Sequence, residues 1–288
     1  MNITPPVRGL VAGVGVLLAI VGVGVGVSSA QPRPGAAPMS GPAATAATLK
    51  VEGYLASDQV ADSVRLLGPP PADGSGTKTG DVATFRATRS LEGSPRWALA
   101  ARDADYGPAP MMRAMSCAAN IDLDPAAMPA LFHLLSRAAV DAETSGHQAK
   151  AAFRRPRPFV ENGGGTICVA AEDWLKKSYS YPSGHSTFSW TAGLILAQVA
   201  PDRSTAILSR ARAYGESRVV CGVHYPSDIQ AGRTVASALF SALQDNAVYR
   251  ADLERARAEL ARARAASPGG FSAERCAVEA QASATPVW

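Results

Sequence analysis

The chain is 288 residues long, with 47% hydrophobic and 18% charged residues and a formal net charge of +4. This length and composition indicate a globular protein with a sizeable core, arranged as one large domain or two small ones. The positive charge is spread along the sequence without long basic runs, so it gives no support to a nucleic-acid partner and leaves small anions open as ligands.

Residues 1–30 have the features of a secretory signal peptide. Arg8 precedes an apolar run over residues 10–27, and small residues come before Gln31, as signal peptidase requires. We expect cleavage after Ala30 and a periplasmic or secreted protein. An uncleaved anchor is the alternative, because the 18-residue run just reaches spanning length, but its glycines favour cleavage. No later segment is long and apolar enough to cross a bilayer, so no membrane span is expected after signal cleavage.

The rest of the chain divides into three parts. Residues 31–49 are rich in proline and alanine and predict a flexible linker. Residues 50–266 predict an all-α domain, and residues 267–288 form a C-terminal tail. Apolar residues at three- and four-residue spacing, with Pro, Ser, Asp or Gly at the ends, predict helices over 125–150, 183–200, 227–244 and 246–265. Two stretches are loop-like, 66–76 and 157–168.

The four cysteines, Cys117, Cys168, Cys221 and Cys276, are far apart in the sequence and show neither CxxC nor Cys/His ligand spacing. In an exported protein this pattern favours disulfides over a zinc site. Three pairings are possible at this point, and four buried free thiols are the alternative.

Three short stretches concentrate polar residues that can carry chemistry. In the first, Lys150 stands seven residues before Arg157, which precedes a proline; alone, this is typical of a solvated basic patch at a helix end. In the second, Ser183 follows a proline and predicts a helix N-cap. Gly184 and His185 then lie in the first helical turn, where backbone N–H groups favour an anion, although a lone stretch of this kind is more often only a helix start.

The third stretch, residues 217–228, places Arg218 six residues before His224, and Asp228 four residues after it. Pro226 and the serine that follows it indicate a helix start. Asp228 is therefore expected in the first turn of that helix, within reach of the His224 imidazole. By itself such a His–Asp pair is more often structural than catalytic.

Taken together, the order K-x6-RP, PSGH and SR-x5-H-x3-D resembles the phosphatase signature of the type 2 phosphatidic acid phosphatase superfamily, which also contains the vanadium haloperoxidases. Within it, the chain is similar to the class A bacterial non-specific acid phosphatases over residues 50–265, including LLGPPPADGSG, SYPSGHS and GESRVVCGVHYPSD. The resemblance implies a single compact helical domain. The signal, the linker and the tail lie outside it. Of the two arginines in RPRP, only Arg157 has the right distance from Lys150, so Arg155 is expected behind the site.

The residues also argue for phosphoryl chemistry directly. A phosphoryl group in transfer spreads negative charge over three oxygens and needs fixed donors. Lys150 offers a point charge, while Arg157 and Arg218 offer planar forks matched to phosphate oxygens. Ser183 and Gly184 complete a cradle at a helix N-terminus. No carboxylate cluster or Cys/His set in the sequence suggests a metal, and the three cations supply the charge that a metal would bring, so neither metal nor cofactor is expected.

The two histidines of these stretches are candidates for nucleophilic and acid–base catalysis. A neutral imidazole held in one tautomer by a carboxylate is a good nucleophile, and His224 has Asp228 to hold it. His185 would protonate the leaving alkoxide and later activate water. The expected function is that of an exported, metal-independent acid phosphatase with a broad range of phosphate monoesters and a phosphohistidine intermediate. The sequence leaves a homodimer open.

Three alternatives stand beside this function. A vanadium-dependent haloperoxidase would use the same pocket. A lipid phosphatase of the superfamily would normally carry several membrane spans, which the sequence does not predict. A non-enzymatic phosphate-binding protein would need neither a His–Asp pair nor a second histidine.

Other polar residues receive structural roles. Asp122 and Asp124 resemble a calcium or magnesium pair, but capping of a helix that starts near residue 125 is the favoured role. His133 and His147 have no partner in the sequence and are expected at packing or surface positions. Two aromatic residues are candidates for the pocket mouth, Tyr179 and Tyr181.

The positions of the cysteines favour one pairing. Cys168 follows the first polar stretch and Cys221 lies inside the third, so both are expected at the same pocket wall and are paired. Cys117 then pairs with Cys276 and tethers the tail beyond the last predicted helix.

Overall fold

The computed structural model describes residues 51–267, 269–285 and 287–288. This part of the chain consists of helices and loops and contains no strand, which confirms the all-α prediction. Across the same residues, no helix combines the length and apolar character that crossing a membrane requires. The predicted signal peptide (1–30) and linker (31–49) lie outside the described residues.

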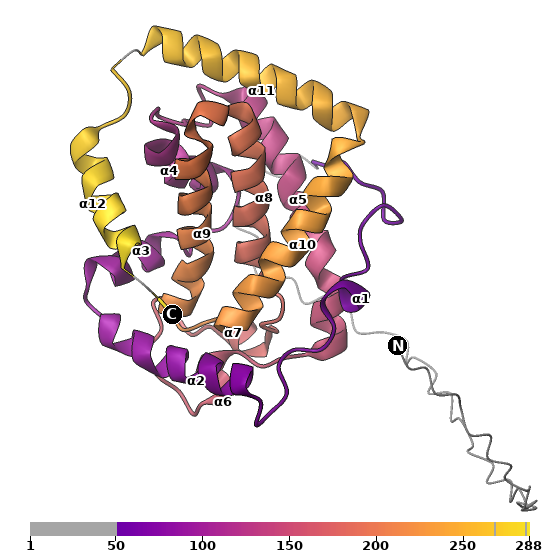
Figure 1. The fold of residues 1–288 in the computed structure, drawn as a ribbon, viewed down its shortest axis with the longest axis vertical. Helices are drawn as coiled ribbons and strands as arrows, with labels where there is room; N and C mark the ends of the chain where they lie inside the picture. Colours follow the sequence, from indigo (N-terminus) through magenta and orange to yellow (C-terminus); the bar gives the residue numbers. More distant parts are fainter. Residues whose placement is uncertain (1–50, 268, 286) are drawn as a thin grey trace, which may run out of the picture. The chain divides into compact units, whose positions relative to one another are not determined.

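The helices are, in chain order, α1 (Ser63–Leu67), α2 (Gly76–Thr88), α3 (Pro95–Arg102), α4 (Pro108–Ala119), α5 (Pro129–Phe153), α6 (Pro158–Glu161), α7 (Asp173–Lys177), α8 (Gly184–Val199), α9 (Ser204–Val220), α10 (Pro226–Gln244), α11 (Ala247–Ala266) and α12 (Ala273–Ala284). Short 3-10 turns, η1 (Arg89–Leu91) and η2 (Pro201–Arg203), follow α2 and α8. The order is shown in Figure 1.

Helices α8, α9 and α10 lie side by side, and α5 packs against α8 (Figure 1). Two glycines permit these close approaches. A Cβ on Gly193 of α8 would lie 2.5 Å from the Cβ of Ala211 on α9, and a Cβ on Gly232 of α10 would lie 2.7 Å from the carbonyl oxygen of Ser183. The first turn of α8 is therefore held directly against α10, which is where the predicted site residues gather.

The structure corrects two predicted boundaries. The helix expected from residue 125 begins at Pro129, because residues 124–128 form a turn in which the Met128 N–H donates to the Asp124 carbonyl at 2.9 Å. The Asp124 carboxylate accepts from the Ala126 N–H at 3.2 Å, so it caps this turn and not α5. The loop-like stretch 157–168 contains the short helix α6.

Helix α9 leads directly into the third polar stretch. The helix continues to Val220 and has Cys221 as its C-cap, which places Arg218 in its last turn. The Cys221 carbonyl accepts from the Cys168 N–H at 3.1 Å. The loop that follows α6 is thereby fixed to the end of α9, next to the third polar stretch.

The cysteines lie together in the two predicted pairs, at disulfide distance. Their Cα atoms are 5.3 Å apart for Cys117 and Cys276 and 4.6 Å apart for Cys168 and Cys221, within the range that disulfides span. The tail contains a helix, α12, which the sequence analysis did not predict. Glu279 of α12 accepts from the Arg210 side chain of α9 at 3.0 Å, so an ion pair and a cysteine pair both join the tail to the preceding helices.

Candidate active site

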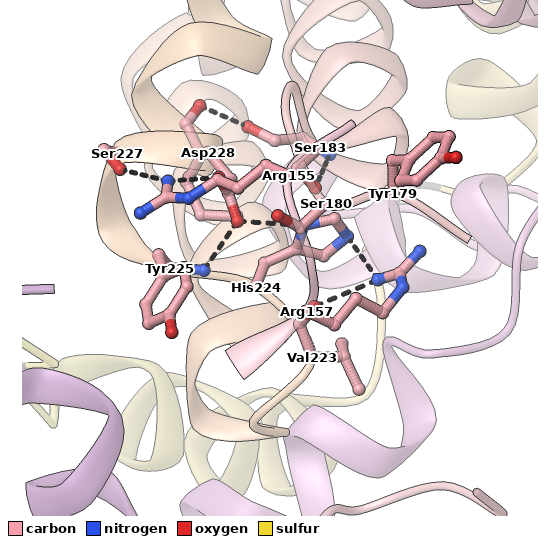
Figure 2. Close-up of polar contacts among 12 residues, drawn as sticks. Arg155, Arg157, Tyr179, Ser180, Ser183, Val223, His224, Tyr225, Ser227 and Asp228 are labelled. Carbon is pink, nitrogen blue, oxygen red and sulfur yellow. Dashed lines mark hydrogen bonds and ion pairs between the residues drawn. The ribbon is translucent and has the colours of Figure 1, made fainter. Parts of the chain in front are cut away.

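The site lies where the first turn of α8, the last turn of α9 and the start of α10 meet (Figure 2). The last turn of α5 and the loop after it supply two of its cations. The structure brings together the eight residues predicted for this site: Lys150, Arg157, Ser183, Gly184, His185, Arg218, His224 and Asp228.

His224 is buried between an arginine and a carboxylate. Its Nε2 lies 3.0 Å from Arg157 Nη1, and its Nδ1 lies 3.4 Å from Asp228 Oδ2. A guanidinium can only donate, so Nε2 must be the unprotonated nitrogen and Nδ1 carries the proton. Among the described residues Nδ1 makes no hydrogen bond, and Asp228 Oδ2 is its ion-pair neighbour. This tautomer leaves the Nε2 lone pair on the side of the cations, as a nucleophile toward phosphorus requires.

Asp228 is fully buried and its two oxygens have different partners. Oδ2 accepts from the Tyr225 N–H at 2.8 Å, which closes a capping box at the start of α10. Oδ1 accepts from Arg155 Nη1 at 2.6 Å. The Asp228 carbonyl accepts from the Ser183 N–H at 3.0 Å, which joins the first turns of α10 and α8. Figure 2 shows Arg155 on the Asp228 side and Arg157 on the His224 side.

Three cations of the site have few anionic partners. Lys150 Nζ donates to the Tyr179 carbonyl at 3.0 Å, and Arg157 donates to the Ser178 hydroxyl and the Val223 carbonyl. Arg218 is only 4% exposed, and within the described residues its Nε and Nη1 have no hydrogen-bond partner. Buried donors are nearly always satisfied, so these two nitrogens indicate a ligand that accepts hydrogen bonds.

The crowding of cations alters the protonation of the site. Burial and the Arg157 charge lower the pKa of Lys150 to about 7. Burial and the surrounding cations also lower the pKa of His224 well below its ordinary range, and the same causes act on His185. A bound anion would relieve both the burial cost and the repulsion. The electrostatics therefore favour an anionic ligand.

Helix α8 begins as predicted. Ser183 is its N-cap, and the Ser183 hydroxyl accepts from the Ser186 N–H at 3.3 Å. The first N–H groups of a helix have no partner within the helix and attract anions. His185, in the same turn, packs against the Tyr106 ring at 4.8 Å and has its Nε2 3.0 Å from the Ala104 carbonyl. Because a carbonyl only accepts, Nε2 carries a proton, and Nδ1 is the nitrogen left for proton exchange.

Sequence reasoning missed Asp81 of α2. Its carboxylate accepts from Arg155 Nη2 at 2.7 Å and from the Ser227 N–H at 3.1 Å. One signal was present: Asp81 lies four residues before the buried Phe85 on the same helix face, and a carboxylate on a buried face needs a cation. The loop before α4, which supplies Ala104 and Tyr106, carried no such signal.

The two remaining histidines lie apart from the site. His133 and His147 are largely exposed and face Asp252 and Glu143. Of the two tyrosines proposed for the mouth, Tyr179 is exposed, whereas the other is buried against Phe153. Within residues 51–267, 269–285 and 287–288, no three His, Cys, Asp or Glu side chains are grouped to hold a metal ion.

Comparison with known proteins agrees with the geometry. Residues 126–249 match the sequence profile of the PAP2 superfamily. An acid phosphatase of Zymomonas mobilis subsp. mobilis is 43% identical over 203 residues, which is 70% of this chain and 77% of that protein. Non-specific acid phosphatases of Providencia stuartii and Salmonella typhi are 35% and 31% identical, over 73% and 75% of this chain and 85% and 86% of their own lengths. The chain therefore belongs to the PAP2 superfamily and, within it, to the family of non-specific acid phosphatases.

Proposed function

We propose that the protein is an exported acid phosphatase that hydrolyses a broad range of phosphate monoesters through a phosphohistidine intermediate on His224, without a metal ion. The observation that carries the proposal is the pair of unpartnered Arg218 nitrogens, buried beside a histidine whose Nε2 lone pair faces the same cations. The phosphatase names of the relatives support hydrolysis over the haloperoxidase alternative. The cysteine pairs and the predicted signal peptide support export.

Substrate binding would use every donor of the site. The non-bridging oxygens of the ester accept hydrogen bonds from Lys150, Arg157 and Arg218 and from the first N–H groups of α8. Arg157 moves its Nη1 donor from His224 to a phosphate oxygen, which frees the lone pair of Nε2. The negative charge of the ester raises the pKa values of both histidines, which the cations lower in the free site.

The reaction proceeds in two displacements. In the first, His224 Nε2 forms a bond to phosphorus while the ester P–O bond breaks, and the leaving oxygen takes both electrons of that bond and a proton from His185 Nδ1. In the second, His185 accepts a proton from water, the water oxygen bonds to phosphorus, and the P–N bond returns its electrons to His224. Asp228 stabilises the positive charge that His224 carries in the intermediate.

A phosphate-release screen over sugar phosphates, nucleotides and aryl phosphates, with and without EDTA, tests the activity. We expect turnover of several classes, unchanged by the chelator. Phosphate binding without turnover would instead support the non-enzymatic alternative, and loss on chelation that a divalent metal restores would contradict the metal-free mechanism.

Trapping of the intermediate tests the roles of the two histidines. With an activated aryl phosphate, whose leaving group needs little protonation, His185→Ala should still become labelled on His224. His224→Ala should remain unlabelled with every substrate. Acid-labile, base-stable label on His185 of the wild type would reverse the two roles.

A further inference from the structure

A buried charge network lies behind the His224–Asp228 pair and is not used by the mechanism above. Arg155 is held between two carboxylates: Nη1 donates to Asp228 Oδ1 at 2.6 Å and Nη2 donates to Asp81 Oδ2 at 2.7 Å. Nη1 also donates to the Ser227 hydroxyl at 2.7 Å. All of these side chains are buried.

The network bears on the ionisation of Asp228, which matters for a phosphatase that is active at acid pH. The Asp228 carboxylate must stay ionised to hold the His224 proton, yet it has no exposed surface, and burial raises the pKa of Asp228 above its ordinary value. The Arg155 cation acts against this rise, followed by the Tyr225 N–H. Asp81 in turn fixes the guanidinium from α2, outside the residues that match the family profile.

We propose that Arg155, anchored by Asp81, is a positioning residue that keeps Asp228 ionised in acid and turns its Oδ2 toward His224. The inference rests on the proposed function. Arg155 donates to Oδ1, and Oδ2, which also accepts from the Tyr225 N–H, is the oxygen that lies beside Nδ1 of the histidine. Asp81 also balances the charge of Arg155. Asp81, Arg155 and Asp228 together therefore have a single net negative charge, which lies beside the His224 imidazole.

The other charged and titratable groups near Asp228 come from several elements. Lys150 of α5 and Tyr181 of the loop before α8 interact with its charge, and Glu161 of α6 interacts with Arg155. The pKa of Lys150 is lowered to about 7, so its titration affects the basic side of a pH profile. Loss of the Arg155–Asp228 contact is therefore expected to displace the acid side of the profile and to leave the basic side in place.

The test replaces the outer ion pair as a unit. Arg155→Gln alone leaves a buried unpaired Asp81 and can fail to fold, so the decisive variant is Arg155→Gln combined with Asp81→Asn, which removes one cation and one anion. An opposite charge at this distance shifts a carboxyl by roughly one to three pH units. We expect the acid limb of kcat/KM for an activated aryl phosphate to move up by at least about one unit. The loss of rate should be smaller near neutral pH, where Asp228 is ionised in both proteins, than in acid, and inhibition by inorganic phosphate should change less than about twofold.

Two further variants complete the experiment. Arg155→Lys keeps the charge and should keep the acid limb in place while lowering the rate. Asp141→Asn is the matched control. Asp141 lies on α5, nine residues before Lys150, is as buried as Asp81, at 2% exposure, and accepts from the Tyr54 and Leu55 N–H groups. This substitution should lower thermal stability without moving the acid limb.

The outcomes separate the two hypotheses. If the wild type turns over the substrate and the double variant shows an unmoved acid limb, or a rate reduced equally at all pH values, the positioning role is wrong and the phosphatase proposal stands. If the wild type shows no turnover, both fall.

Discussion

Replacing Arg218 with methionine is expected to stabilise the ligand-free protein and to abolish its stabilisation by phosphate. The buried guanidinium has two nitrogens without a hydrogen-bond partner in the described part of the chain, and each unsatisfied buried group costs about 1–3 kcal/mol. Methionine keeps an apolar side chain of similar length and carries no donor. We therefore expect the free energy of unfolding without phosphate to rise by about 2–6 kcal/mol, the cost of the two nitrogens together.

The effect on phosphate binding has the opposite sign. At a phosphate concentration of about 100 Kd the wild type should gain roughly 2.7 kcal/mol. Loss of two hydrogen bonds to a charged group, at about 1.5–3 kcal/mol each, weakens binding by more than about a hundredfold. At the same phosphate concentration the Arg218→Met variant should then gain no more than about 0.4 kcal/mol.

Urea unfolding of the disulfide-intact protein, with and without inorganic phosphate, measures both quantities. Arg210→Met is the matched control, because Arg210 lies on the same helix and is 5% exposed, but its side chain is paired with Asp103 and Glu279. Its removal leaves a buried carboxylate unpaired and should cost about 3–5 kcal/mol. Equal destabilisation by the two substitutions, or full phosphate stabilisation of Arg218→Met, would refute the assignment of Arg218 to the anion.

Two further predictions concern protonation and the cysteines. Lys150 should lose its proton in the free enzyme as the pH rises through about 7, so kcat/KM should fall above that pH, and Lys150→Gln should abolish this basic limb; a limb that persists in the variant would assign it to another group. Non-reducing peptide mapping should find Cys168 linked to Cys221 and Cys117 linked to Cys276. Replacing Cys168 and Cys221 with serine opens a loop of 53 residues and should cost about 4 kcal/mol, whereas recovery of a Cys117–Cys168 peptide would show a different pairing.

Local signals were sufficient to predict the parts of the fold that present the site. Ser183 and Asn246 cap the helices that follow them, and Pro226 occupies the first turn of α10; each of these effects depends on neighbours within a few residues. The spacing of Lys150 and Arg157 also predicted that both cations lie near His224. That prediction depended on the resemblance to a family, because periodicity alone does not indicate it.

Other features depend on contacts between distant segments and could not be read locally. Asp81 meets Arg155 across 74 positions of the chain, and nothing within α2 indicates which cation neutralises it. The predicted start of α5 was wrong because Asp124 caps a turn that precedes the helix. An aspartate that caps a turn and one that caps a helix have the same sequence pattern. Helix α12 was not predicted because its apolar pattern covers only a short segment. Its contacts with the distant helices α3 and α4 help to stabilise it.

The position of Cys276 has a consequence for the order of biosynthesis. Its partner Cys117 lies 159 residues earlier, so the helices that carry the candidate site are synthesised before the second thiol of this bridge. A chain that is clipped before the tail can still contain every residue of the candidate site, but it keeps an unpaired thiol at position 117 and leaves Arg210 without the Glu279 carboxylate. Oxidation of this pair therefore follows the synthesis of Cys276, and a free thiol at position 117 marks chains in which the bridge has not formed.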